Sequence, residues 1–588
     1  MPTRSADIKP AYPAVCDAGT EVVFSVAALP SAMSADPGDD VRVLGIEGTA
    51  WAASGAVYDA ATGTVDIETE AYLPESGGIH PREAAEHMAE HLPAVVERAL
   101  ERARELADAQ AEGGDGPPVD CVAFSRGPGL GPCLRIAGTA GRALAQRLDV
   151  PLVGVNHMVA HLEIGRHRSG FASPVCLNAS GANAHVLGYR SGRYRVLGET
   201  MDTGVGNALD KFTRHVGWSH PGGPKVEAAA EDGAYLDLPY VVKGMDFSFS
   251  GITSAAKAAY DDGEAIEDVC FSLQETVFAM LTEVSERALS LTGSDELVLG
   301  GGVGQNARFR EMLGAMCTQR GADFFAPEDR FLRDNAGMIA VLGAKMFRAG
   351  DTVPVVESGI DADFRPDEVP VTWDVPSSVD RHVSRAEGGP DQVQGAEATV
   401  TFEGDRVVKE RNPRECRHPD LDGRLRRERT RAEVRLTSEA RRAGVPTPVV
   451  HDVDPAAGRL VFQHVGRCDL RDALSAERVR SVAAHLATLH GAGLVHGDPT
   501  TRNVRVDPAE GADPALFLVD FGLGYYTDDP EDYAMDLHVF GGSLAGTAED
   551  ADRLVSAAET AYRGVESGPD VDVVLDQLQE IEGRGRYQ

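Results

Sequence analysis

Along the first two thirds of the chain, short apolar runs alternate with longer stretches of mixed apolar and charged residues. The β-branched runs at 121–124, 151–155 and 296–301 each lead to a glycine and then to a helical stretch. A segment rich in Ala, Glu and Arg at 81–107 has the length and periodicity of an amphipathic helix. This succession predicts an α/β architecture whose ligands bind at the ends of the strands.

The amino-acid composition of the chain changes at about residue 365. Residues 365–390 are dense in Pro, Gly, Ser and acidic residues and poor in apolar ones, which is typical of an interdomain linker. Strands are predicted again at 399–402 and 406–409, followed by an Arg-rich helix at 424–443. The predicted organisation is a poorly ordered tail at 1–40, a first globular unit at 41–364, a linker at 365–390 and a second, smaller unit at 391–588.

Composition narrows the setting in which the protein works. No run of 18 apolar residues occurs, so we expect no membrane span, and the eight cysteines are scattered without a Cys-x-x-Cys pair, as in a reducing cytoplasm. The net charge is −36, and only seven of the 56 basic residues are lysine. An acidic surface favours adaptation to a salty cytoplasm. Because salt at 1 M screens charges beyond about 3 Å, this charge does not exclude an RNA partner.

The first unit contains a candidate metal site. His157 and His161 are four residues apart at the start of a predicted helix, so both lie on one face and can ligate a metal together. A zinc protease of the His-Glu-x-x-His type would need a glutamate as its general base beside the first histidine. Met158 occupies that position, which argues against a peptidase.

Several loops of small residues follow in the same unit. Residues 178–183 are Asn-Ala-Ser-Gly-Ala-Asn after a strand, and such loops bring backbone amides to a phosphate, although many are plain turns. The segment His-Pro-Gly-Gly-Pro-Lys at 220–225 is a rigid turn that opens a helix, with Glu227 one turn in. Glycine-rich residues 300–306 and Asp334 at a later helix start complete the series.

Together these motifs resemble a known family. His-Pro-Arg-Glu at 80–83, Gly-Ile-Glu-Gly-Thr-Ala-Trp at 45–51, the histidine pair, the 220–225 turn, Phe-Ser-Phe-Ser-Gly at 247–251 and the loop ending at Asn306 are similar to the universal tRNA threonylcarbamoyltransferase, the catalytic subunit of the KEOPS complex in its archaeal and eukaryotic form. The resemblance covers about 41–364. It implies a two-lobed, actin-like and sugar-kinase-like ATPase fold with a nucleotide between the lobes.

The resemblance also implies the roles of particular residues. His157, His161 and Asp334 would ligate one divalent metal, iron or zinc. In archaeal members a tyrosine precedes the Ser-Gly-Gly-Asn loop as a further ligand, whereas this chain has Asn178, which offers only a neutral oxygen and implies a weaker hold on the metal or an extra water. Nucleotide contacts would fall on Asn178, Ala179, Ser180, Gly181, Ala182, Asp210, Gly223, Glu227 and Asn306.

The second unit carries motifs of a kinase. His-Gly-Asp-Pro-Thr-Thr-Arg-Asn at 496–503 and Asp-Phe-Gly at 520–522 resemble the catalytic loop and the magnesium motif of protein kinases. Asp498 would orient or deprotonate a hydroxyl, while Asn503 and Asp520 would hold Mg²⁺ on ATP. Lys409 is the candidate phosphate-binding lysine and Glu433 its ion-pair partner.

This unit also departs from ordinary protein kinases. Gln-Gly-Ala-Glu-Ala at 394–398 replaces the glycine-rich loop, and no Ala-Pro-Glu motif follows Gly522. The second unit is therefore similar to the small RIO-like kinase of KEOPS, a small bilobal α+β domain, over about 391–588. In that family ATP hydrolysis supports the transferase. Residues 405–442 contain 13 Arg or Lys against 8 Asp or Glu, which is either a salt-bridged face or a contact with tRNA phosphates.

We therefore expect a cytoplasmic fusion of two KEOPS subunits. It would transfer threonylcarbamoyl from threonylcarbamoyl-AMP to the N6 amine of adenosine 37, beside the anticodon, in tRNAs that read ANN codons. Implied partners are tRNA, the small accessory KEOPS subunits and a separate synthase of threonylcarbamoyl-AMP. The alternatives are a small-molecule kinase on the actin-like fold, a true Ser/Thr protein kinase, and a non-enzymatic, ATP-gated scaffold whose metal loop has decayed, to which Asn178 would point.

Overall fold

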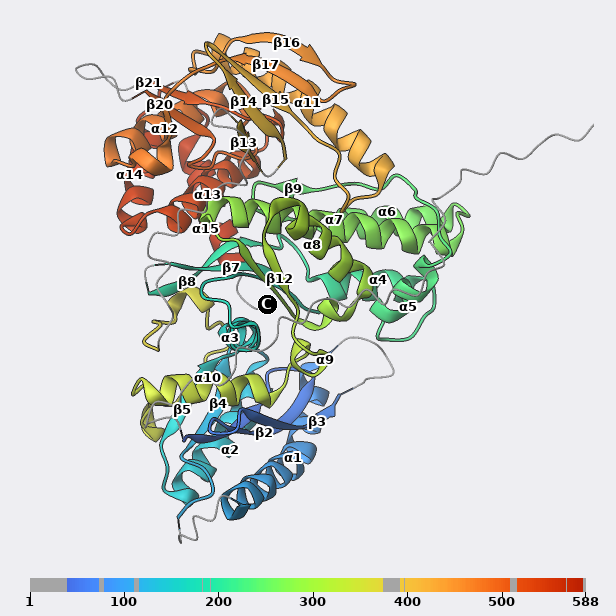
Figure 1. The fold of residues 1–588 in the computed structure, drawn as a ribbon, viewed down its shortest axis with the longest axis vertical. Coiled ribbons are helices and arrows are strands. Elements are labelled where there is room, and N and C mark those ends of the chain that lie inside the picture. The colour runs from blue at the N-terminus through green and yellow to red at the C-terminus, as the bar shows by residue number, and fades with distance from the viewer. Residues whose placement is uncertain are drawn as a thin grey trace, which may run out of the picture. The chain divides into compact units, whose positions relative to one another are not determined.

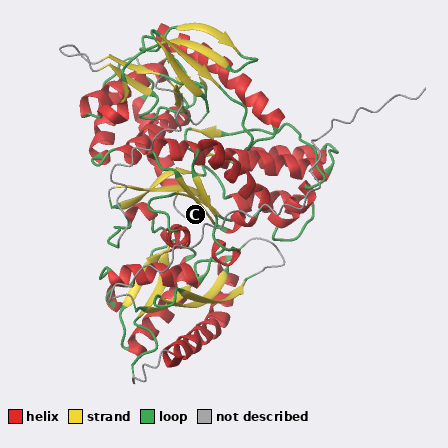
Figure 2. Ribbon diagram, viewed as in Figure 1, coloured by secondary structure: helices red, strands yellow, loops and turns green. Residues whose placement is uncertain are grey.

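The structure is a computed structural model of the chain. It describes residues 40–72, 79–109, 116–373 and 392–584, without positions 182, 191, 396, 508–514 and 567. Apart from Asp40, the expected tail lies outside the described residues, as does most of the expected linker. The described residues from Val41 onward belong to one compact unit, in which sheets alternate with layers of helix (Figures 1 and 2).

The first lobe is built on a five-stranded mixed sheet in the order β3-β2-β1-β4-β5, in which β1 pairs antiparallel with β2 and parallel with β4. Two helices, α1 and α2, cover one face, and α10 covers the other (Figure 1). The elements are β1 (Arg42–Glu47), β2 (Ala52–Asp59), β3 (Thr64–Ala71), β4 (Cys121–Gly127), β5 (Leu152–Asn156), α1 (Pro81–Ala109), α2 (Gly131–Leu148) and α10 (Ala336–Arg348). The helix predicted at 81–107 is thus confirmed.

The second lobe repeats this plan. Its mixed sheet has the order β12-β11-β6-β7-β8, with parallel pairing of β6, β11 and β12 and antiparallel pairing of β6, β7 and β8. The sheet contains β6 (Val175–Ala179), β7 (Ala184–Arg190), β8 (Arg193–Glu199), β11 (Glu296–Gly300) and β12 (Asp323–Phe325). Two similar α/β lobes confirm the expected two-lobed fold of the first unit.

The helices of the second lobe supply the walls of the candidate site. α7 is buried along nearly its whole length and packs on the sheet, while α3 packs against both β11 and α10 of the first lobe. The helices are α3 (His157–Ser169), α4 (Val205–His215), α5 (Gly223–Ala230), α6 (Ser250–Asp261), α7 (Ile266–Thr292), α8 (Ala307–Arg320) and α9 (Asp329–Leu332), with the short elements β9 (Val242–Lys243), β10 (Asp246–Phe247) and η1 (Gly302–Gln305). The short helix η2 (Val355–Glu357) packs against the core of the first lobe.

The first residues of the expected linker are packed structure. η3 (Pro366–Glu368) contacts β8, and the Val371 amide donates to the Gly192 carbonyl at 2.9 Å. Trp373 is buried in the core of the first unit. Composition alone classed this segment as linker because Pro and acidic residues dominate it, but its few apolar side chains are enough to anchor it.

The second unit begins with an antiparallel sheet in the order β13-β14-β15-β17-β16, against which α11 packs. The strands are β13 (Gln392–Gln394), β14 (Thr399–Glu403), β15 (Arg406–Glu410), β16 (Val450–Asp454) and β17 (Arg459–Gln463), and the helix is α11 (Pro419–Arg442). Helix α11 begins five residues earlier than the predicted Arg-rich helix, because Pro419 fits the first helical turn and the His418 side chain accepts from the amide of Asp420.

A mostly helical lobe completes the second unit, as a small kinase-like fold requires. Its core joins α11 to the C-terminal helices and to two small antiparallel sheets. The elements are β18 (Cys468–Asp469), η4 (Leu470–Ala473), α12 (Ala476–Gly491), β19 (Leu494–Val495), β20 (Val504–Asp507), β21 (Ala515–Leu518), β22 (Tyr525–Tyr526), α13 (Pro530–Thr547), α14 (Ala551–Arg563) and α15 (Val571–Arg584).

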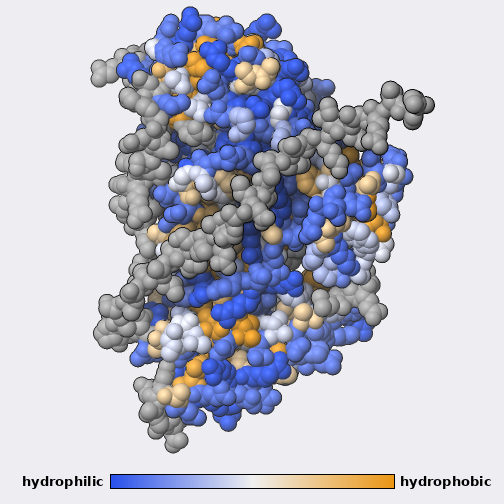
Figure 3. Space-filling model, turned by 45° about the vertical axis from the view of Figure 1, so that its right-hand side comes forward, coloured by the Kyte–Doolittle hydropathy of each residue, from blue (hydrophilic) through white to orange (hydrophobic). Residues whose placement is uncertain are grey.

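On the face shown in Figure 3 the described side chains are mainly hydrophilic, with small hydrophobic patches between them. None of the described helices combines the length and apolar character that a bilayer crossing requires.

Candidate metal centre and nucleotide sites

Three metal-ligating side chains converge where α3 meets the start of α10. His157 Nε2 lies 3.3 Å and His161 Nε2 lies 3.1 Å from the same atom, Asp334 Oδ1. Their ligand atoms all lie within 4.8 Å of one another. Asn156 caps α3 by accepting from two amides of its first turn, and this fixes the helix so that both histidines face Asp334. The spacing of the two histidines places them on one face of α3. The fold brings Asp334, the third ligand that the resemblance implied, beside both of them.

Glu47, at the end of β1, stands behind the first histidine. Its side chain is fully buried, and its Oε2 accepts from His157 Nδ1 at 3.0 Å while its Oε1 accepts from the Thr49 amide at 2.8 Å. A carboxylate that accepts from one ring nitrogen of a histidine orients the ring and leaves the other nitrogen for a metal. Glu47 lies within the motif at 45–51, but the sequence alone assigned it no role.

The carboxylates also set the protonation of the pair. Burial opposes a charged His157, but Glu47 and Asp334 outweigh it and raise the pKa of His157 to about 10. Burial, with the charge on His157 close by, lowers the pKa of His161. Although burial raises it, the pKa of Asp334 is held well below its usual range by the two imidazoles. A divalent ion bound here would therefore displace a proton from His157.

Asn178 is the last residue but one of β6, so it belongs to the strand and not to the loop after it. Its Oδ1 is buried without a hydrogen-bond donor, while its Nδ2 lies 3.7 Å from Met158 Sδ. The neighbouring Gly301 has φ +84°, and a Cβ there would lie 2.7 Å from Asn178 Oδ1 and 2.2 Å from the Ala179 carbonyl oxygen, so only glycine fits. A buried acceptor without a donor is costly, and a cation would satisfy it. Two imidazoles and a carboxylate, with a spare amide oxygen near them, fit a divalent ion such as iron or zinc.

The small-residue loop after β6 is tied to the start of α4. The Gly206 amide donates to the Ser180 carbonyl at 3.1 Å, and the Asn207 amide donates to the Gly181 carbonyl at 2.9 Å. Ala179 ends the strand and is buried. Ala182, the last expected contact of this loop, lies outside the described residues.

Asp210 on α4 holds the proline–glycine turn in place. Its Oδ1 accepts from the Gly222 amide at 2.7 Å, and its Oδ2 lies 3.0 Å from His220 Nδ1. Gly223 is the first residue of α5, as the turn predicted. The carboxylate thus positions the turn in this conformation.

Glu227 and Asn306 bring α5 and α8 together. Glu227 Oε1 accepts from the Ala307 amide at 2.7 Å, and Asn306 caps α8 by accepting from the Phe309 amide at 3.0 Å. Asn306 Nδ2 also donates to Gln274 on α7 at 2.8 Å. The residues expected to touch a nucleotide are therefore linked, loop to loop, around helix N-termini of the second lobe, where backbone amides favour anions.

In the second unit, the expected lysine and its partners meet. Lys409 Nζ lies 2.9 Å from Glu433 Oε1 and 2.7 Å from Asp520 Oδ1. Arg411, which sequence reasoning did not select, joins them at 2.6 Å from Glu433 Oε2. Burial raises the pKa of Asp520, but Lys409 and Arg411 outweigh it and keep that pKa below its usual value. An ionised Asp520 is the state that Mg²⁺ requires.

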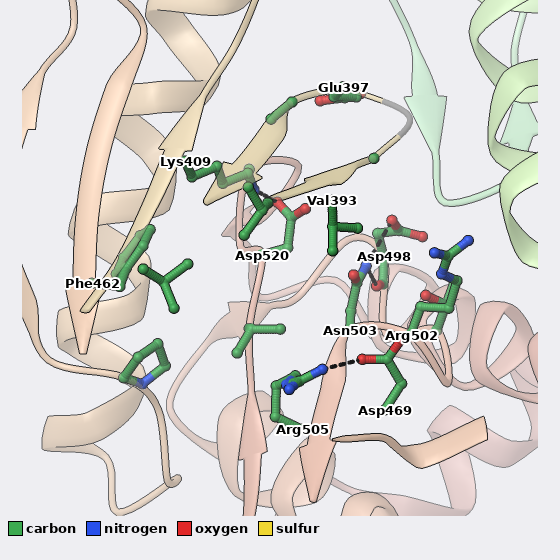
Figure 4. A pocket seen from close by; sticks show the side chains of 18 of the residues that line it. Val393, Glu397, Lys409, Phe462, Asp469, Asp498, Arg502, Asn503, Arg505 and Asp520 are labelled. Carbon is green, nitrogen blue, oxygen red and sulfur yellow. Dashed lines mark hydrogen bonds and ion pairs between the residues drawn. The ribbon is translucent and has the colours of Figure 1, made fainter. Parts of the chain in front are cut away.

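The expected catalytic loop faces the same pocket, which has a volume of about 460 Å³. Asn503 Nδ2 donates to Asp498 Oδ2 at 2.9 Å, and both residues line the same pocket as Lys409 and Asp520, where Figure 4 shows them to the right of Asp520. Burial raises the pKa of Asp498 to about 6 against the opposing charge of Arg287. A carboxylate with a pKa near neutrality, beside two candidate Mg²⁺ ligands, has the properties of a base that orients or deprotonates a nucleophile.

Comparison with known proteins agrees with both halves of this description. Residues 62–341 match the family tRNA N6-adenosine threonylcarbamoyltransferase. A "probable bifunctional tRNA threonylcarbamoyladenosine biosynthesis protein" of Haloarcula marismortui is 68% identical over 93% of this chain and 100% of its own length. The chain belongs to this bifunctional family. Relatives of the same description from Halobacterium salinarum and Methanospirillum hungatei are 68% and 48% identical over 93% of this chain and 99% of theirs.

Membership explains why two sites occur in one polypeptide. The relatives extend over both halves, so the fusion of a threonylcarbamoyltransferase unit with a kinase-like unit, predicted from the motifs, is confirmed. Sequence reasoning missed the residues that support the sites from behind, namely Glu47, Gln274, Arg287 and Arg411. The only signal for them was polarity at positions where the pattern predicts a buried strand or helix.

Proposed function

We propose that the first unit transfers the threonylcarbamoyl group from threonylcarbamoyl-AMP to the N6 amine of adenosine 37 in tRNAs that read ANN codons. The observation that carries the proposal is the convergence of His157, His161 and Asp334. These three residues would hold one divalent metal, iron or zinc, with Asn178 offering a further, neutral oxygen. The bound metal supplies a Lewis acid for the carbamoyl or phosphate oxygen.

The remaining contacts in the site are assigned to residues of this chain. Amides of 179–181 and the N-terminus of α8 would face the phosphate of the donor, where partial positive charge favours an anion. Asp210 and Glu227 would accept from the ribose or the base, and Asn306 would keep α8 aligned through its cap. Glu47 holds the ring of His157 so that its Nε2 faces the metal position.

We further propose that the second unit binds ATP and Mg²⁺ and hydrolyses ATP in support of the transferase. The Lys409–Glu433 ion pair, with Asp520 2.7 Å from the lysine, supports this, because it has the arrangement that holds ATP phosphates in kinases. Asp498 would orient the attacking hydroxyl or water, and Asn503 and Asp520 would hold Mg²⁺. The protein would act in the cytoplasm with tRNA, the small KEOPS subunits and a separate threonylcarbamoyl-AMP synthase.

A transfer assay tests the first proposal. The full chain, at high salt, is given threonylcarbamoyl-AMP, unmodified tRNA and the accessory subunits, beside the double variant His157→Ala/His161→Ala. We expect transfer by the wild type and its loss in the variant, with folding checked by circular dichroism. Absence of transfer with either iron or zinc, while ATP hydrolysis persists, would instead favour an ATP-gated scaffold.

A further inference from the structure

Arg287 belongs to the transferase unit, but its guanidinium lies in the nucleotide pocket of the kinase-like unit. It sits near the end of α7, and its side chain is 8% exposed. Its Nη2 lies 2.5 Å from Glu397 Oε1, and its Nη1 lies 3.6 Å from Asp498 Oδ2. Both carboxylates line the pocket shown in Figure 4, where Glu397 is above and Asp498 below. One side chain of the first unit therefore faces two acidic groups of the second unit's candidate site.

Two contacts within the first unit fix the position of this guanidinium, one with a side chain and one with a backbone carbonyl. Nη2 also lies 2.8 Å from Glu283 Oε1, one turn earlier on α7, and Nη1 donates to the Gly244 carbonyl at 3.0 Å. These contacts come from the transferase unit alone. They set the direction in which Arg287 projects and so reduce the conformational freedom that the side chain would otherwise lose on meeting its partners.

Glu397 lies in the segment that replaces the glycine-rich loop of protein kinases. Gly395 and Ala398 close this segment into a turn between β13 and β14, since the Gly395 amide donates to the Ala398 carbonyl at 2.8 Å. Arg429 on α11 shares Glu397 with Arg287, at 2.5 Å. The turn that would cover the phosphates of ATP is thus held by one arginine from each unit.

We infer that Arg287 is a positioning residue of the ATP site: from α7 of the transferase unit it sets the turn at Glu397 and the carboxylate of Asp498 relative to each other, so that ATP hydrolysis in the kinase-like unit depends on this side chain. The inference rests on the proposed ATP hydrolysis. In that step a water oxygen bonds to the γ-phosphorus, the bond to the bridging oxygen breaks, ADP leaves with the electron pair, and the water proton passes to Asp498 or to the phosphate. Arg287 aligns Asp498 with that water, and no bond to Arg287 changes.

An alternative is that Arg287 only fastens the two units together. Lys243 provides a matched control, because its Nζ lies 2.5 Å from Asp532 Oδ1 and thus forms another ion pair between the units, without contact to Glu397 or Asp498. A residue that merely fastens would behave like Lys243. A positioning residue would change catalysis at constant ATP affinity.

The experiment compares the full chain with Arg287→Lys, Arg287→Leu and Lys243→Ala at high salt. ATP hydrolysis is measured as kcat and KM, and hydrogen exchange is followed at the amides of residues 397–399. We expect Arg287→Leu to lower kcat roughly 10²-fold, the size seen when one preorganised donor is removed, while KM changes less than about threefold. Arg287→Lys should recover part of kcat, because it keeps the charge without the fork. Exchange should rise at 397–399 in Arg287→Leu and remain as in the wild type in Lys243→Ala.

The outcomes distinguish a failure of the proposed ATP hydrolysis from a failure of the role inferred for Arg287. An inactive wild type would refute the proposed ATP hydrolysis and with it the catalytic role of Arg287. An active wild type with unchanged kcat in Arg287→Leu would overturn the inference alone, as would equal losses in Arg287→Leu and Lys243→Ala. Unchanged exchange at 397–399 in Arg287→Leu would overturn it as well, whatever the activity, because the turn would then not depend on this arginine.

Discussion

At the scale of single residues, the candidate sites consist of charged groups whose partners are buried with them. His157 lies between Glu47 and Asp334, and Lys409 lies between Glu433 and Asp520. In each site one acid, Glu47 or Glu433, is almost fully buried and holds the basic side chain in place. The other acid, Asp334 or Asp520, is more exposed and faces the open side of the site. The supporting acid decides orientation, and the facing acid is available to a ligand.

Replacing Glu47 with glutamine tests the supporting role directly. The amide is nearly the same size but is a weaker acceptor, so His157 loses part of its orientation and basicity. We expect metal affinity to fall about 10- to 100-fold, as for other partners of metal-bound histidines. Isothermal titration with the metal ion would measure this, with the exposed Glu70→Gln as control. An unchanged affinity in Glu47→Gln would contradict the role given to Glu47.

At the scale of elements, α3 connects the metal centre to the cores of both lobes of the first unit. Glu163, two residues beyond the second histidine, is fully buried and binds Arg166, Lys345 on α10 and Tyr194 on β8. Burial opposes its ionisation, but Lys345 and Arg166 outweigh it and lower the pKa of Glu163 to about 2. Burial, with repulsion from Arg166, lowers the pKa of Lys345 as well. The charged form of Glu163 is stabilised by two cations, whereas the charged form of Lys345 is disfavoured by burial and by Arg166.

This cluster predicts a pH dependence of stability. Since the pKa of Glu163 is about 2 in the fold and near 4.5 when unfolded, its contribution is fully present above pH 4.5 and is lost as the pH falls towards 2. The contribution is about 2–3 kcal/mol. Urea unfolding at pH 7, 5, 4 and 3 should show the loss in the wild type and a smaller one in Glu163→Gln. Parallel losses in both proteins would assign the acid limb to other groups.

At the scale of the whole molecule, arginines of the second unit meet acids of the first. Glu283 on α7 is 1% exposed, and it lies 2.7 Å from Arg417 and 2.9 Å from Arg429 in addition to Arg287. The Arg-rich region at 405–442 therefore serves in part to join the units. Of the two expectations for this region, a salt-bridged face or a contact with tRNA phosphates, these ion pairs support the first for Arg417 and Arg429.

Removing the shared acid Glu283 should destabilise the contact between the two units and lower the free energy of unfolding. Glu283→Gln leaves buried guanidiniums without their common partner, a loss of about 3–5 kcal/mol in the free energy of unfolding. Denaturant unfolding measures it. Glu68→Gln is the control, because the Arg98–Glu68 pair is about half exposed and is worth about 0–1 kcal/mol. Similar values for the two variants would show that the buried network is not important for stability.

The net charge of −36 predicts a dependence on salt. At low ionic strength the acidic residues repel one another over a Debye length of about 30 Å, against about 3 Å at 1 M salt. We expect the melting temperature to rise steadily as KCl is raised from 0.01 M towards molar concentrations. A flat profile would contradict adaptation of the surface to salt.

Much of the fold could be predicted from the sequence, because its signals are local. The spacing of the histidines gave two metal ligands, and the resemblance to a known family implied the third, Asp334. Periodicity located helix α1, the proline–glycine turn located the start of α5, and the spacing of His157 and His161 placed two ligands on one face. The kinase-like loop and its Asp-Phe-Gly motif were found in the same way. Each of these is determined by interactions within a few residues of chain.

The tertiary structure shows how groups that are distant in the chain meet, and it alone added supporting residues such as Glu47 and Arg287. Glu47 meets His157 across 110 residues, and Asp334 meets His161 across 173. Nothing in the chain around Arg287 indicates that it faces Asp498, because it reads as an ordinary charged position of a long helix. The sequence by itself determined the elements and the chemical groups they carry. These groups converge because the buried apolar faces of helices and strands pack in one arrangement. Charged groups buried by this packing have no water around them and therefore pair with one another.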